Sequence, residues 1–465
     1  MPTYLGVDLG TSGLRGVLID QDLQVLAHAA LPYPGAWLDS NMWLLGLEQL
    51  AAIIRNQNPP AWRAIKAITF DGTSGTVLPC AVDGSALMPA LAYSDQRAEA
   101  EAQWLHQHWP TGGIVLSPAS SLNKLLWLRN HLSHFDALRY IHHPADWVAA
   151  QLTGHFGVSD RGNLLKLGVN AQTLDYPPEL LRILEQVGID PRLLPTALRE
   201  GTAIAPVRAS WTNRLALPAH TEVRAGCTDS VAAAMAAGLS RPGQALSSLG
   251  SSLACKVVHS QPINNNGIYS HFLDEYCLVG TASNAGGASL LRYFSRDEMQ
   301  TMTALLCPDS PTGALFYPLP KPGERFPLNA PQWSGSEIPL LKTAAIFQGL
   351  LEGLSYIEAW MYSTLKQAGV RITAPIRSVG GGSENAKWMQ MRANILNHPI
   401  EVLTNSDAAT GAALLAASSE YGSVEATIQK YAKVGRIIMP DPDAAEKYQP
   451  YTQKFRETFV AASSY

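Results

Sequence analysis

Four short segments of the sequence carry residue types that can bind phosphate, accept a proton or recognise a sugar. The first is the loop Asp8–Gly13, whose small residues include Gly10, Thr11 and Ser12. Such a loop lets backbone N–H groups approach an anion and lets hydroxyls donate to it, and a carboxylate such as Asp8 suits a hydrated Mg²⁺. A plain polar hairpin turn has the same composition, so the loop alone leaves both interpretations open.

The second segment offers a carboxylate at the end of a glycine-containing loop. Asp229 follows Ala225–Thr228 and precedes the alanine-rich run Val231–Ala237, with Gly238 after it. A carboxylate held there can accept a proton from a substrate hydroxyl. The alternative is structural, because an aspartate at this position is also a favoured helix N-cap and Gly238 a helix stop.

The third segment is the glycine run Gly380–Gly382, which lies between the strand-like stretch Ile376–Val379 and a helix. Consecutive glycines cost backbone entropy, which the close approach of another group would offset. The helix start adds unpaired N–H groups and a positive dipole end. We expect a nucleotide to contact Gly381, Gly382 and Asn385; a flexible loop is the alternative.

The fourth segment combines the loop Asp71–Thr76 with the stretch Tyr93–Arg97. Their hydroxyls, carboxylates and guanidinium suit a polyhydroxylated substrate, since each sugar hydroxyl both donates and accepts hydrogen bonds. Ser74 and Asp95 are the candidates for sugar contacts. The pair Asp71-Gly72 alone is typical of an ordinary turn.

The elements that must position these residues alternate between strands and helices. Tyr4–Val7 and Gly16–Ile19 flank the first loop and predict a β-hairpin. Residues 43–55 follow a helical period, and Ala64–Phe70 is a short apolar strand. Strands and helices mixed on this scale predict an α/β fold.

A similar motif to the first loop occurs in the second half of the chain. Leu9–Ser12 corresponds to Leu249–Ser252, and both stretches lie between apolar runs. Chance is one explanation, because glycine and serine are common in turns. Duplication is the other, and it makes Gly250, Ser251 and Ser252 a second phosphate-binding loop.

The break at Arg241–Gly243 predicts a boundary between two domains, residues 1–242 and 243–465. Residues 407–417 are predicted to form a helix of mostly small side chains. The segment from Asp441 predicts an amphipathic helix whose partner the sequence leaves open, the first domain being one candidate. The apolar face of that helix would carry Tyr448, Phe455 and Phe459.

Composition and charge exclude several classes of protein. The chain has 465 residues, of which 46% are hydrophobic and 15% charged, whereas a typical domain is about 25% charged. This excludes a disordered chain, and a net charge of −4 offers no basic surface to nucleic acid. No uncharged apolar stretch reaches the roughly 18 residues of a membrane span, and the start lacks the basic segment of a signal peptide. We therefore expect a cytoplasmic monomer or homodimer that binds neither nucleic acid nor membrane.

Motifs for metal clusters and disulfides are missing from the sequence. The five cysteines are widely spaced and include no Cys-x-x-Cys pair, which favours a reducing compartment. The sequence has no Gly-Lys-Ser/Thr loop, no Gly-x-Gly-x-x-Gly loop and no His-Glu-x-x-His helix. His131 and His134, or His142 and His143, have no metal-ligand spacing, so we expect surface or core histidines.

Taken in order, these motifs resemble the FGGY carbohydrate kinases of the actin–hexokinase–Hsp70 superfamily. Gly6–Ser12 is similar to the family's first phosphate loop, Leu249–Ser252 to its second, and Ala225–Asp229 to the segment of its catalytic aspartate. Gly380–Gly382 with Trp388 is similar to its adenosine segment, and Ala409–Ala413 to the helix that follows. The resemblance implies an α/β fold of two actin-like (ribonuclease H-like) domains, with mixed sheets flanked by helices and ATP and sugar in a cleft between them.

The resemblance also implies roles for single residues. Asp229 would be the catalytic base, Asp8 and Asp229 would hold Mg²⁺, and Thr11 and Ser251 would lie near the phosphates. Ser74, together with the two aspartates, would hold the sugar.

The loop at residues 71–76, which the resemblance makes a substrate loop, narrows the range of sugars expected as substrate. Xylulokinases usually carry Ser-Gly-Gln-Met-His-Gly there, whereas this chain has Asp-Gly-Thr-Ser-Gly-Thr at residues 71–76. That form looks like the xylulokinase-like proteins that act as D-ribulokinases, which implies ATP-dependent conversion of a ketopentose, D-ribulose, to its 5-phosphate. D-Xylulokinase or another FGGY sugar kinase is the alternative. A sugar-independent ATPase and a nucleotide-gated binding protein are more distant alternatives, because they share the same core.

Overall fold

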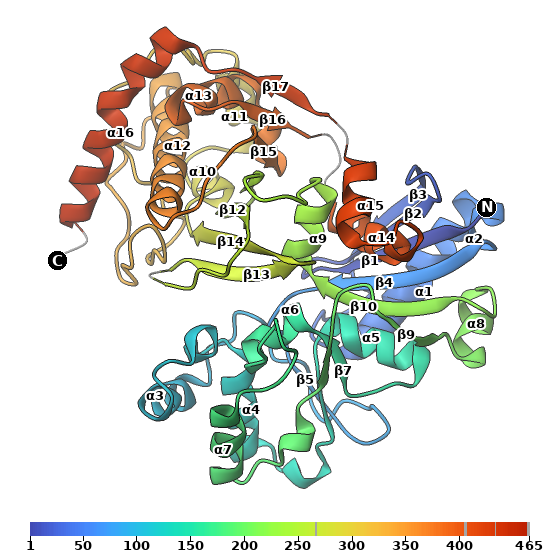
Figure 1. Cartoon of the computed structure of the whole chain (residues 1–465). Coiled ribbons are helices and arrows are strands. Elements are labelled where there is room, and N and C mark those ends of the chain that lie inside the picture. The colour runs from blue at the N-terminus through green and yellow to red at the C-terminus, as the bar shows by residue number, and fades with distance from the viewer. Residues whose placement is uncertain (266, 404–406, 433, 463–465) are drawn as a thin grey trace. The chain divides into compact units, whose positions relative to one another are not determined.

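The computed structural model of the protein describes residues 1–265, 267–403, 407–432 and 434–462. The chain packs as two compact units (Figure 1). Unit 1 comprises Met1–Gly238, Phe272–Asp274 and Asp407–Ala432, and unit 2 comprises the described residues of Leu239–His271, Glu275–Ser406 and Lys433–Tyr465. Both units combine mixed sheets with flanking helices, which confirms the predicted two-domain α/β class.

Unit 1 contains the first part of the chain and a late helical segment. Its strands are β1 (Thr3–Leu9), β2 (Leu14–Asp20), β3 (Val25–Leu31), β4 (Ile65–Gly72), β5 (Leu78–Cys80), β6 (Tyr140–His142), β7 (Val158–Asp160), β8 (Thr196–Leu198), β9 (Ala203–Pro206) and β10 (Glu222–Thr228). Its α-helices are α1 (Ser40–Gln57), α2 (Pro59–Trp62), α3 (Glu99–His108), α4 (Ser121–His131), α5 (Pro144–Thr153), α6 (Arg161–Leu164), α7 (Pro178–Gln186), α8 (Ala209–Leu215), α9 (Asp229–Ala236), α14 (Ala408–Ala417) and α15 (Val424–Tyr431). Its 3₁₀ helices are η1 (Gly113–Leu116), η2 (Phe135–Ala137), η3 (Leu165–Leu167), η4 (Pro191–Leu193) and η6 (Ser418–Glu420).

Unit 2 holds the second sheet and the longer helices. Its strands are β11 (Ala245–Leu249), β12 (Leu253–His259), β13 (Tyr269–Leu273), β14 (Tyr276–Ser283), β15 (Ile376–Val379), β16 (Ile400–Val402) and β17 (Arg436–Ile438). Its helices are α10 (Gly287–Leu291), α11 (Arg296–Thr303), α12 (Ala344–Gln367), η5 (Gly381–Glu384), α13 (Ala386–Leu396) and α16 (Pro442–Ala462).

The main sheets of the two units repeat one topology. In the described part of unit 1 the strand order is β3-β2-β1-β4-β10-β9, with β1 antiparallel to β2 and parallel to β4. In unit 2 the order β14-β12-β11-β15-β16 runs through the sheet, with β11 antiparallel to β12 and parallel to β15. The predicted hairpin at residues 4–19 is confirmed, and the similar motif at residues 245–259 is a second hairpin in the equivalent place of its sheet.

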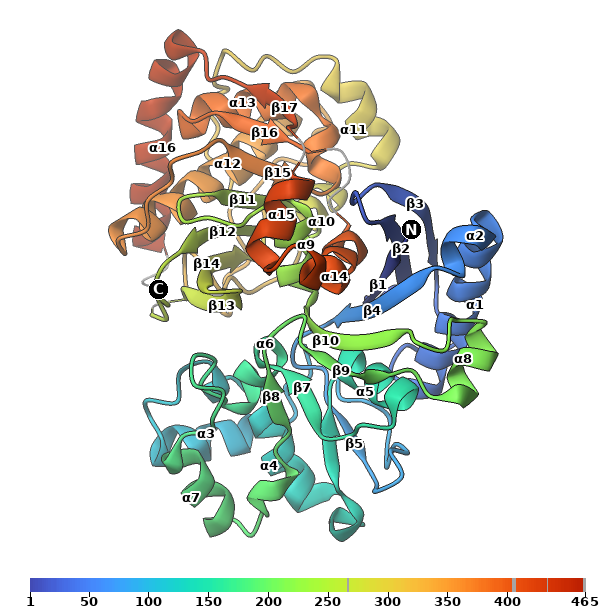
Figure 2. The same ribbon diagram turned by 45° about the vertical axis from the view of Figure 1, so that its right-hand side comes forward.

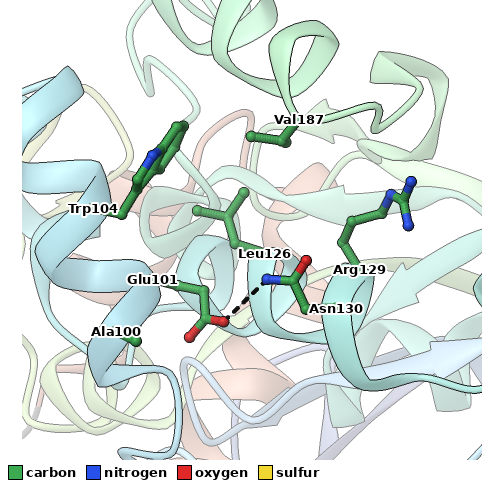
Figure 3. Close-up of a pocket in the computed structure, with 7 residues that line it drawn as sticks. All are labelled: Ala100, Glu101, Trp104, Leu126, Arg129, Asn130 and Val187. Carbon is green, nitrogen blue, oxygen red and sulfur yellow. Dashed lines mark hydrogen bonds between the residues drawn. The ribbon is translucent and has the colours of Figure 1, made fainter.

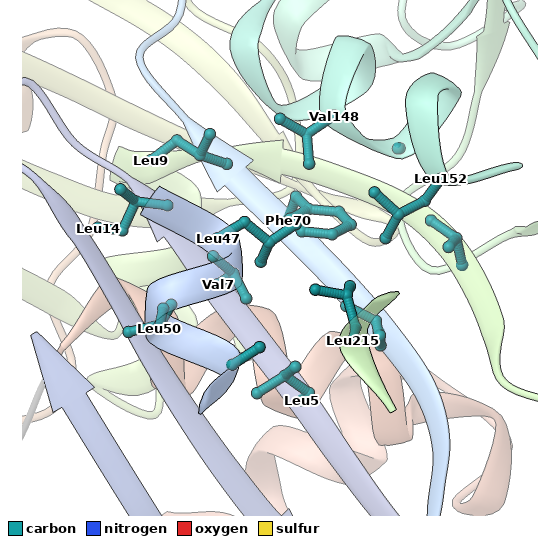
Figure 4. Close-up of a cluster of buried hydrophobic side chains, with 14 of the residues drawn as sticks. Leu5, Val7, Leu9, Leu14, Leu47, Leu50, Phe70, Val148, Leu152 and Leu215 are labelled. Carbon is teal, nitrogen blue, oxygen red and sulfur yellow. The ribbon is translucent and has the colours of Figure 1, made fainter. Parts of the chain in front are cut away.

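Side chains on β1 and β4 alternate between the two faces of the unit 1 sheet, as strand geometry requires. Leu5, Val7 and Leu9 on β1 and Phe70 on β4 point into a buried apolar cluster, which α1 and α5 complete (Figure 4). Side chains on the other face of the sheet, such as that of Tyr4, pack instead against α14.

Two glycines let α14 approach its neighbours closely. A Cβ on Gly6 of β1 would lie 2.1 Å from the carbonyl oxygen of Ala409, and a Cβ on Gly411 would lie 1.9 Å from the carbonyl oxygen of Ala232 in α9. Figures 1 and 2 both show α14 beside β1. The predicted boundary lies at 242/243, whereas the packing divides the chain at 238/239 and adds Phe272–Asp274 and Asp407–Ala432 to unit 1, the latter because α14 covers this sheet.

The last helix, α16, packs within unit 2. Its predicted apolar residues Tyr448, Phe455 and Phe459 are all buried. The ring of Phe455 lies 5.3 Å from that of Tyr356 on α12 and 5.6 Å from that of Tyr317, measured between centroids. These aromatic contacts supply the partner that the sequence left open.

The cysteines and histidines are placed as the sequence analysis expects. All five cysteines are free thiols. His142 and His143 are buried and bond to Asp146, whereas His131 and His134 are exposed. Within the described residues, no helix has both the length and the apolar character needed to cross a membrane.

Candidate active site

Three aspartates lie at one edge of the unit 1 sheet. Asp8, near the end of β1, pairs in register with Asp71 on the parallel strand β4. Asp71 pairs on its other side with Cys227 of β10, and Asp229 follows two residues later, at the start of α9. Because the carboxyl ends of parallel strands meet at the same edge, residues far apart in the sequence become neighbours here.

A fourth carboxylate joins this edge from the other end of the chain. On β1, Asp8 lies on the same face as Tyr4, and on β4, Asp71 lies on the same face as Ala67. This is the face of the sheet that packs against α14. Asp407 is the N-cap of α14, and its carboxylate accepts a hydrogen bond from the N–H of Ala409 at 3.2 Å. The charge of Asp407 contributes to raising the pKa of Asp71.

Asp8 is buried and forms an ion pair. Its Oδ2 accepts a hydrogen bond from Nη1 of Arg15, on the paired strand β2, at 2.9 Å. Burial raises the pKa of Asp8 to about 6, and Arg15 limits that rise. Its carboxylate is therefore available to a cation but already has one cationic neighbour.

Asp71 is fully buried, and no N–H group of the described residues donates to its carboxyl oxygens, whose side-chain neighbour is the carboxyl group of Asp8. Burial, followed by the charges of Asp8 and Asp229, raises its pKa well above the usual range of a carboxyl group. A buried polar group without a partner costs free energy. Native structures retain few such groups, and each requires an explanation.

Asp229 is the first residue of α9 and not its N-cap. Thr228 occupies the cap position and makes no side-chain capping bond. The Asp229 carboxylate accepts a hydrogen bond from the N–H of its neighbour Ser230 at 2.6 Å, and the residue is half-buried. The N-cap interpretation of Asp229 is therefore wrong, although a carboxylate in the first turn still interacts favourably with the helix dipole.

The first predicted phosphate loop is a closed hairpin turn with exposed hydroxyls. The N–H of Gly10 donates to the carbonyl oxygen of Gly13 at 3.1 Å. Thr11 and Ser12 are exposed at the tip of this turn. The loop adjoins Asp8 directly, so its hydroxyls and the carboxylate belong to the same end of β1.

In unit 2, the second predicted loop and the glycine run lie side by side. Ser248 of β11 pairs with Val379 of the parallel strand β15, so Gly250 and Gly380 follow at the same edge of the sheet. A small cavity there is lined by glycines and apolar side chains, namely Leu249, Gly250, Leu253, Gly286, Gly287, Leu354 and Trp388. Ser251 is exposed and Ser252 half-buried next to this cavity.

Protein packing, and not only the predicted contact with a nucleotide, explains the glycine run Gly380–Gly382. A Cβ on Gly380 would lie 2.7 Å from the carbonyl oxygen of Leu249, and one on Gly382 would lie 2.6 Å from the ring of Trp388. Protein packing therefore accounts for two of the three glycines. Only at Gly381 does a Cβ meet nothing within 4 Å, so Gly381 is the glycine of this run that is open to a ligand.

Asn385 has a structural role at the start of α13. Its side-chain oxygen accepts a hydrogen bond from the N–H of Trp388 at 3.0 Å, and its amide group donates to Oγ1 of Thr303 at 2.9 Å. These bonds fix the helix start behind the glycine run. A contact between Asn385 and a nucleotide stays a prediction.

The two predicted sugar segments are adjacent in unit 1. Oγ of Ser74 is buried without a hydrogen-bond partner among the described residues. The carboxylate of Asp95 binds the guanidinium of Arg97, with Nη2 to Oδ2 at 2.8 Å. The N–H of Tyr93 donates to Oγ1 of Thr76 at 3.1 Å, which joins the two segments.

The carboxylates suit a hydrated divalent cation. Within the described residues, no three His, Cys, Asp or Glu side chains are arranged as a ready-made metal site. Mg²⁺ usually keeps several waters and takes one or two carboxylates, a donor set that Asp8 and Asp229 can provide. Asp71 adds a further buried carboxyl group, to which no N–H group of the described residues donates, although Arg15 already pairs with Asp8 at this edge.

A separate cavity of about 320 Å³ lies between α3 and α4 in unit 1 (Figure 3). Trp104 and Leu126 line it, and the side chains of Glu101 and Asn130 bond to each other across it at 3.3 Å. None of the predicted site residues lines this cavity, so it is not the candidate active site.

Comparison with known proteins identifies the family. The N-terminal domain model of the FGGY family of carbohydrate kinases matches residues 3–236, and the C-terminal domain model of the same family matches residues 245–420. The chain belongs to the FGGY family of carbohydrate kinases. It is therefore a sugar kinase of the FGGY type.

Relatives of this FGGY chain match along nearly its whole length. The chain is 25% identical to the xylulose kinase of Staphylococcus xylosus, over 90% of this chain and 91% of the relative, and 25% identical to that of Escherichia coli, over 98% of each. A crystal structure titled as a "xyloylose kinase" from Brucella ovis superposes with a TM-score of 0.88 at 25% identity, over 99% of each chain.

Several polar residues of this candidate site are not predicted from the sequence. Asp407 and Arg15 reach the edge of the sheet only through the packing of α14 and the pairing of β2. The sequence predicts Asp71 only as part of a substrate loop, whereas the parallel pairing of β1 and β4 places it beside Asp8. The helix predicted at residues 407–417 and the resemblance of residues 409–413 to a family helix are the signals near Asp407, and neither indicates which sheet the helix covers.

Proposed function

We propose that the protein is an ATP-dependent ketopentose kinase that phosphorylates the terminal hydroxyl of its sugar. The observation that carries this proposal is the group of carboxylates at the ends of β1, β4 and β10, in a chain of the FGGY family. Half-buried Asp229, on a rigid helix start, is the group best placed to act as base.

Asp229 takes the proton of the sugar hydroxyl as its oxygen attacks the γ-phosphorus of ATP. The new bond forms from that oxygen to phosphorus, the bond from phosphorus to the bridging oxygen breaks, and ADP leaves. Phosphoryl transfer has a loose transition state, so the protein mainly orients the groups and stabilises charge. A base near the hydroxyl contributes about 10²–10⁴-fold to such a step.

The remaining residues bind and orient the substrates. Backbone N–H groups and hydroxyls at Gly10–Ser12 and at Gly250–Ser252 donate to phosphate oxygens. Gly381 leaves room for the adenosine part of ATP, and Ser74 and Asp95 bind sugar hydroxyls. Bound Mg²⁺, held through Asp8 and Asp229, would offset negative charge on the phosphates.

Two sugars are candidates, and different observations favour them. The relatives at 25% identity over nearly the full length are named xylulose kinases, which favours D-xylulose. The loop Asp71–Thr76 lacks the Met-His pair usual in xylulokinases, which favours D-ribulose. Because the full-length relationship involves more of the chain than one loop does, D-xylulose is the first candidate and D-ribulose the second.

The test is ATP turnover by the purified protein with Mg²⁺ and a panel of sugars. The panel contains D-xylulose, D-ribulose, L-ribulose, D-fructose, gluconate and glycerol, with a sample without sugar as the control. We expect turnover to depend on a ketopentose and to yield its 5-phosphate. Equal turnover without sugar would show a sugar-independent ATPase or a nucleotide-gated protein and would refute the proposal.

A further inference from the structure

Two lysines bind the backbone of the loop that carries Ser74. Nζ of Lys124, on α4, donates to the carbonyl oxygen of Gly75 at 2.7 Å and to that of Ala92 at 2.6 Å. Nζ of Lys166, in η3, donates to the carbonyl oxygen of Ser74 at 2.9 Å. The carbonyl groups of two consecutive peptide groups, Ser74–Gly75 and Gly75–Thr76, are thus held by ammonium groups.

Lys124 joins the two segments that are predicted to bind the sugar. Gly75 belongs to the loop at residues 73–76, and Ala92 lies three residues before Asp95. The loop is closed by a hydrogen bond of 2.7 Å between the hydroxyls of Thr73 and Thr76. Lys124 therefore fixes how far Ser74 lies from Asp95.

The position of Lys124 is a costly one for a cation. The residue is fully buried, and its ammonium group bonds to carbonyl oxygens. Burial lowers the pKa of Lys124 to about 7, Lys166 and Arg97 act in the same direction, and Asp95 opposes them. A methionine would fill similar space without this cost, so packing alone does not account for a lysine here.

We propose that Lys124 is a positioning residue for the sugar: it holds the Ser74 loop against the Asp95 segment, with Lys166 as a second anchor, and so sets the affinity for the sugar. This inference rests on the proposed function. Hydrogen bonds from a charged donor are stronger and shorter than neutral ones, and two of them from one atom fix both segments at once.

The test compares Lys124→Met with Lys166→Met and with the control Lys66→Met. Lys66 lies in the same unit and pairs with Glu420 at the surface, away from both segments. Lys124→Met removes both hydrogen bonds of the ammonium group. We expect the KM of the sugar to rise about tenfold or more, while the KM of ATP changes less than about twofold. Lys166→Met should have a smaller effect in the same direction, and Lys66→Met none.

Hydrogen exchange supplies a readout that needs no activity. We expect amides at residues 73–77 and 91–95 to exchange about tenfold faster in Lys124→Met than in the wild type, since local opening governs such exchange. Unchanged exchange together with an unchanged sugar KM would overturn the inference and leave the proposed function standing. A wild type that phosphorylates no sugar refutes the proposed function, and the exchange data then decide the role of Lys124 alone.

A pH profile covers the case in which Lys124→Met does not fold. Above about pH 7 the wild-type lysine loses its proton and its hydrogen bonds weaken, so the sugar KM should rise with pH while the ATP KM stays constant. The charged groups that face Lys124 are Lys166, Asp95 and Arg97, and the same profile measured on Lys166→Met tests whether Lys166 contributes to it. A sugar KM that is flat from pH 6 to 9 would contradict the inference.

Discussion

Asp71 on β4 lies directly opposite Asp8 on β1, in parallel register, and the two buried carboxyl groups interact with each other while no N–H group of the described residues donates to Asp71. Two carboxyl groups on adjacent strands repel when both are ionised, and Asp229 adds a third charge. The pair is thus costly for the folded protein. Its retention at the end of the strands agrees with a role in binding substrate or cation.

We predict that Asp71→Asn stabilises the protein without cation or substrate and lowers its activity. The raised pKa of Asp71 means that the folded protein binds a proton which the unfolded chain has released above about pH 4. The free energy of unfolding of the wild type therefore falls, relative to that of the variant, as pH rises from 4. At pH 7 we expect the variant to be about 1–3 kcal/mol more stable by denaturant unfolding, with a lower kcat/KM for the sugar.

The matched control for this prediction is Asp146→Asn. Asp146 is also a buried aspartate of unit 1, but it accepts hydrogen bonds from the N–H of His143 at 2.6 Å and from His142 at 3.2 Å. Burial alone would raise its pKa, yet the hydrogen bonds of both histidines outweigh burial and lower it to about 2. Its contribution to stability is present above about pH 4 and lost as pH falls toward 2, so Asp146→Asn should destabilise at pH 7. Destabilisation by Asp71→Asn as well would contradict the assignment of Asp71 as a repulsive group.

We predict that Asp229→Asn nearly abolishes sugar phosphorylation. The amide keeps the size of the side chain but cannot accept the hydroxyl proton, so kcat should fall by about 10²–10⁴-fold. Binding of a nucleotide, measured by calorimetry, should change little, because the hydroxyls and glycines predicted to bind ATP are intact. Wild-type turnover by this variant would show that another group is the base.

We predict that Ser74→Ala weakens sugar binding more than ATP binding. Oγ of Ser74 is buried and lacks a partner among the described residues, so a sugar hydroxyl is a suitable partner. Loss of one hydrogen bond should raise the sugar KM about fivefold to tenfold, with the ATP KM unchanged. Ser210→Ala on the exposed face of α8 is the control. Equal changes in both KM values would remove Ser74 from the sugar site.

Local patterns in the sequence predicted the two hairpins, because turn chemistry and strand ends depend on neighbouring residues. Phosphate binding by their turns stays a prediction. Local patterns did not predict Asp407, Arg15 or Lys124. These side chains reach the site through contacts between distant segments, such as the close packing of α14 on Gly6, for which a short window carries no signal. The N-cap interpretation of Asp229 was wrong by one residue, a shift that moved the side chain out of the capping position.

The glycine run shows the same limit and yields the last prediction. Its composition alone could not separate glycines required by Leu249 and Trp388 from the one open to a ligand.

We predict that Gly381→Val folds with unfolding free energy within about 0.5 kcal/mol of the wild type, since its Cβ meets no neighbour. Branched methyl groups at this point should raise the ATP KM about tenfold and leave the sugar KM unchanged. Gly382→Val is the control, because its Cβ would lie 2.6 Å from the Trp388 ring and should destabilise the fold. An unchanged ATP KM in Gly381→Val would mean that the nucleotide does not contact this glycine.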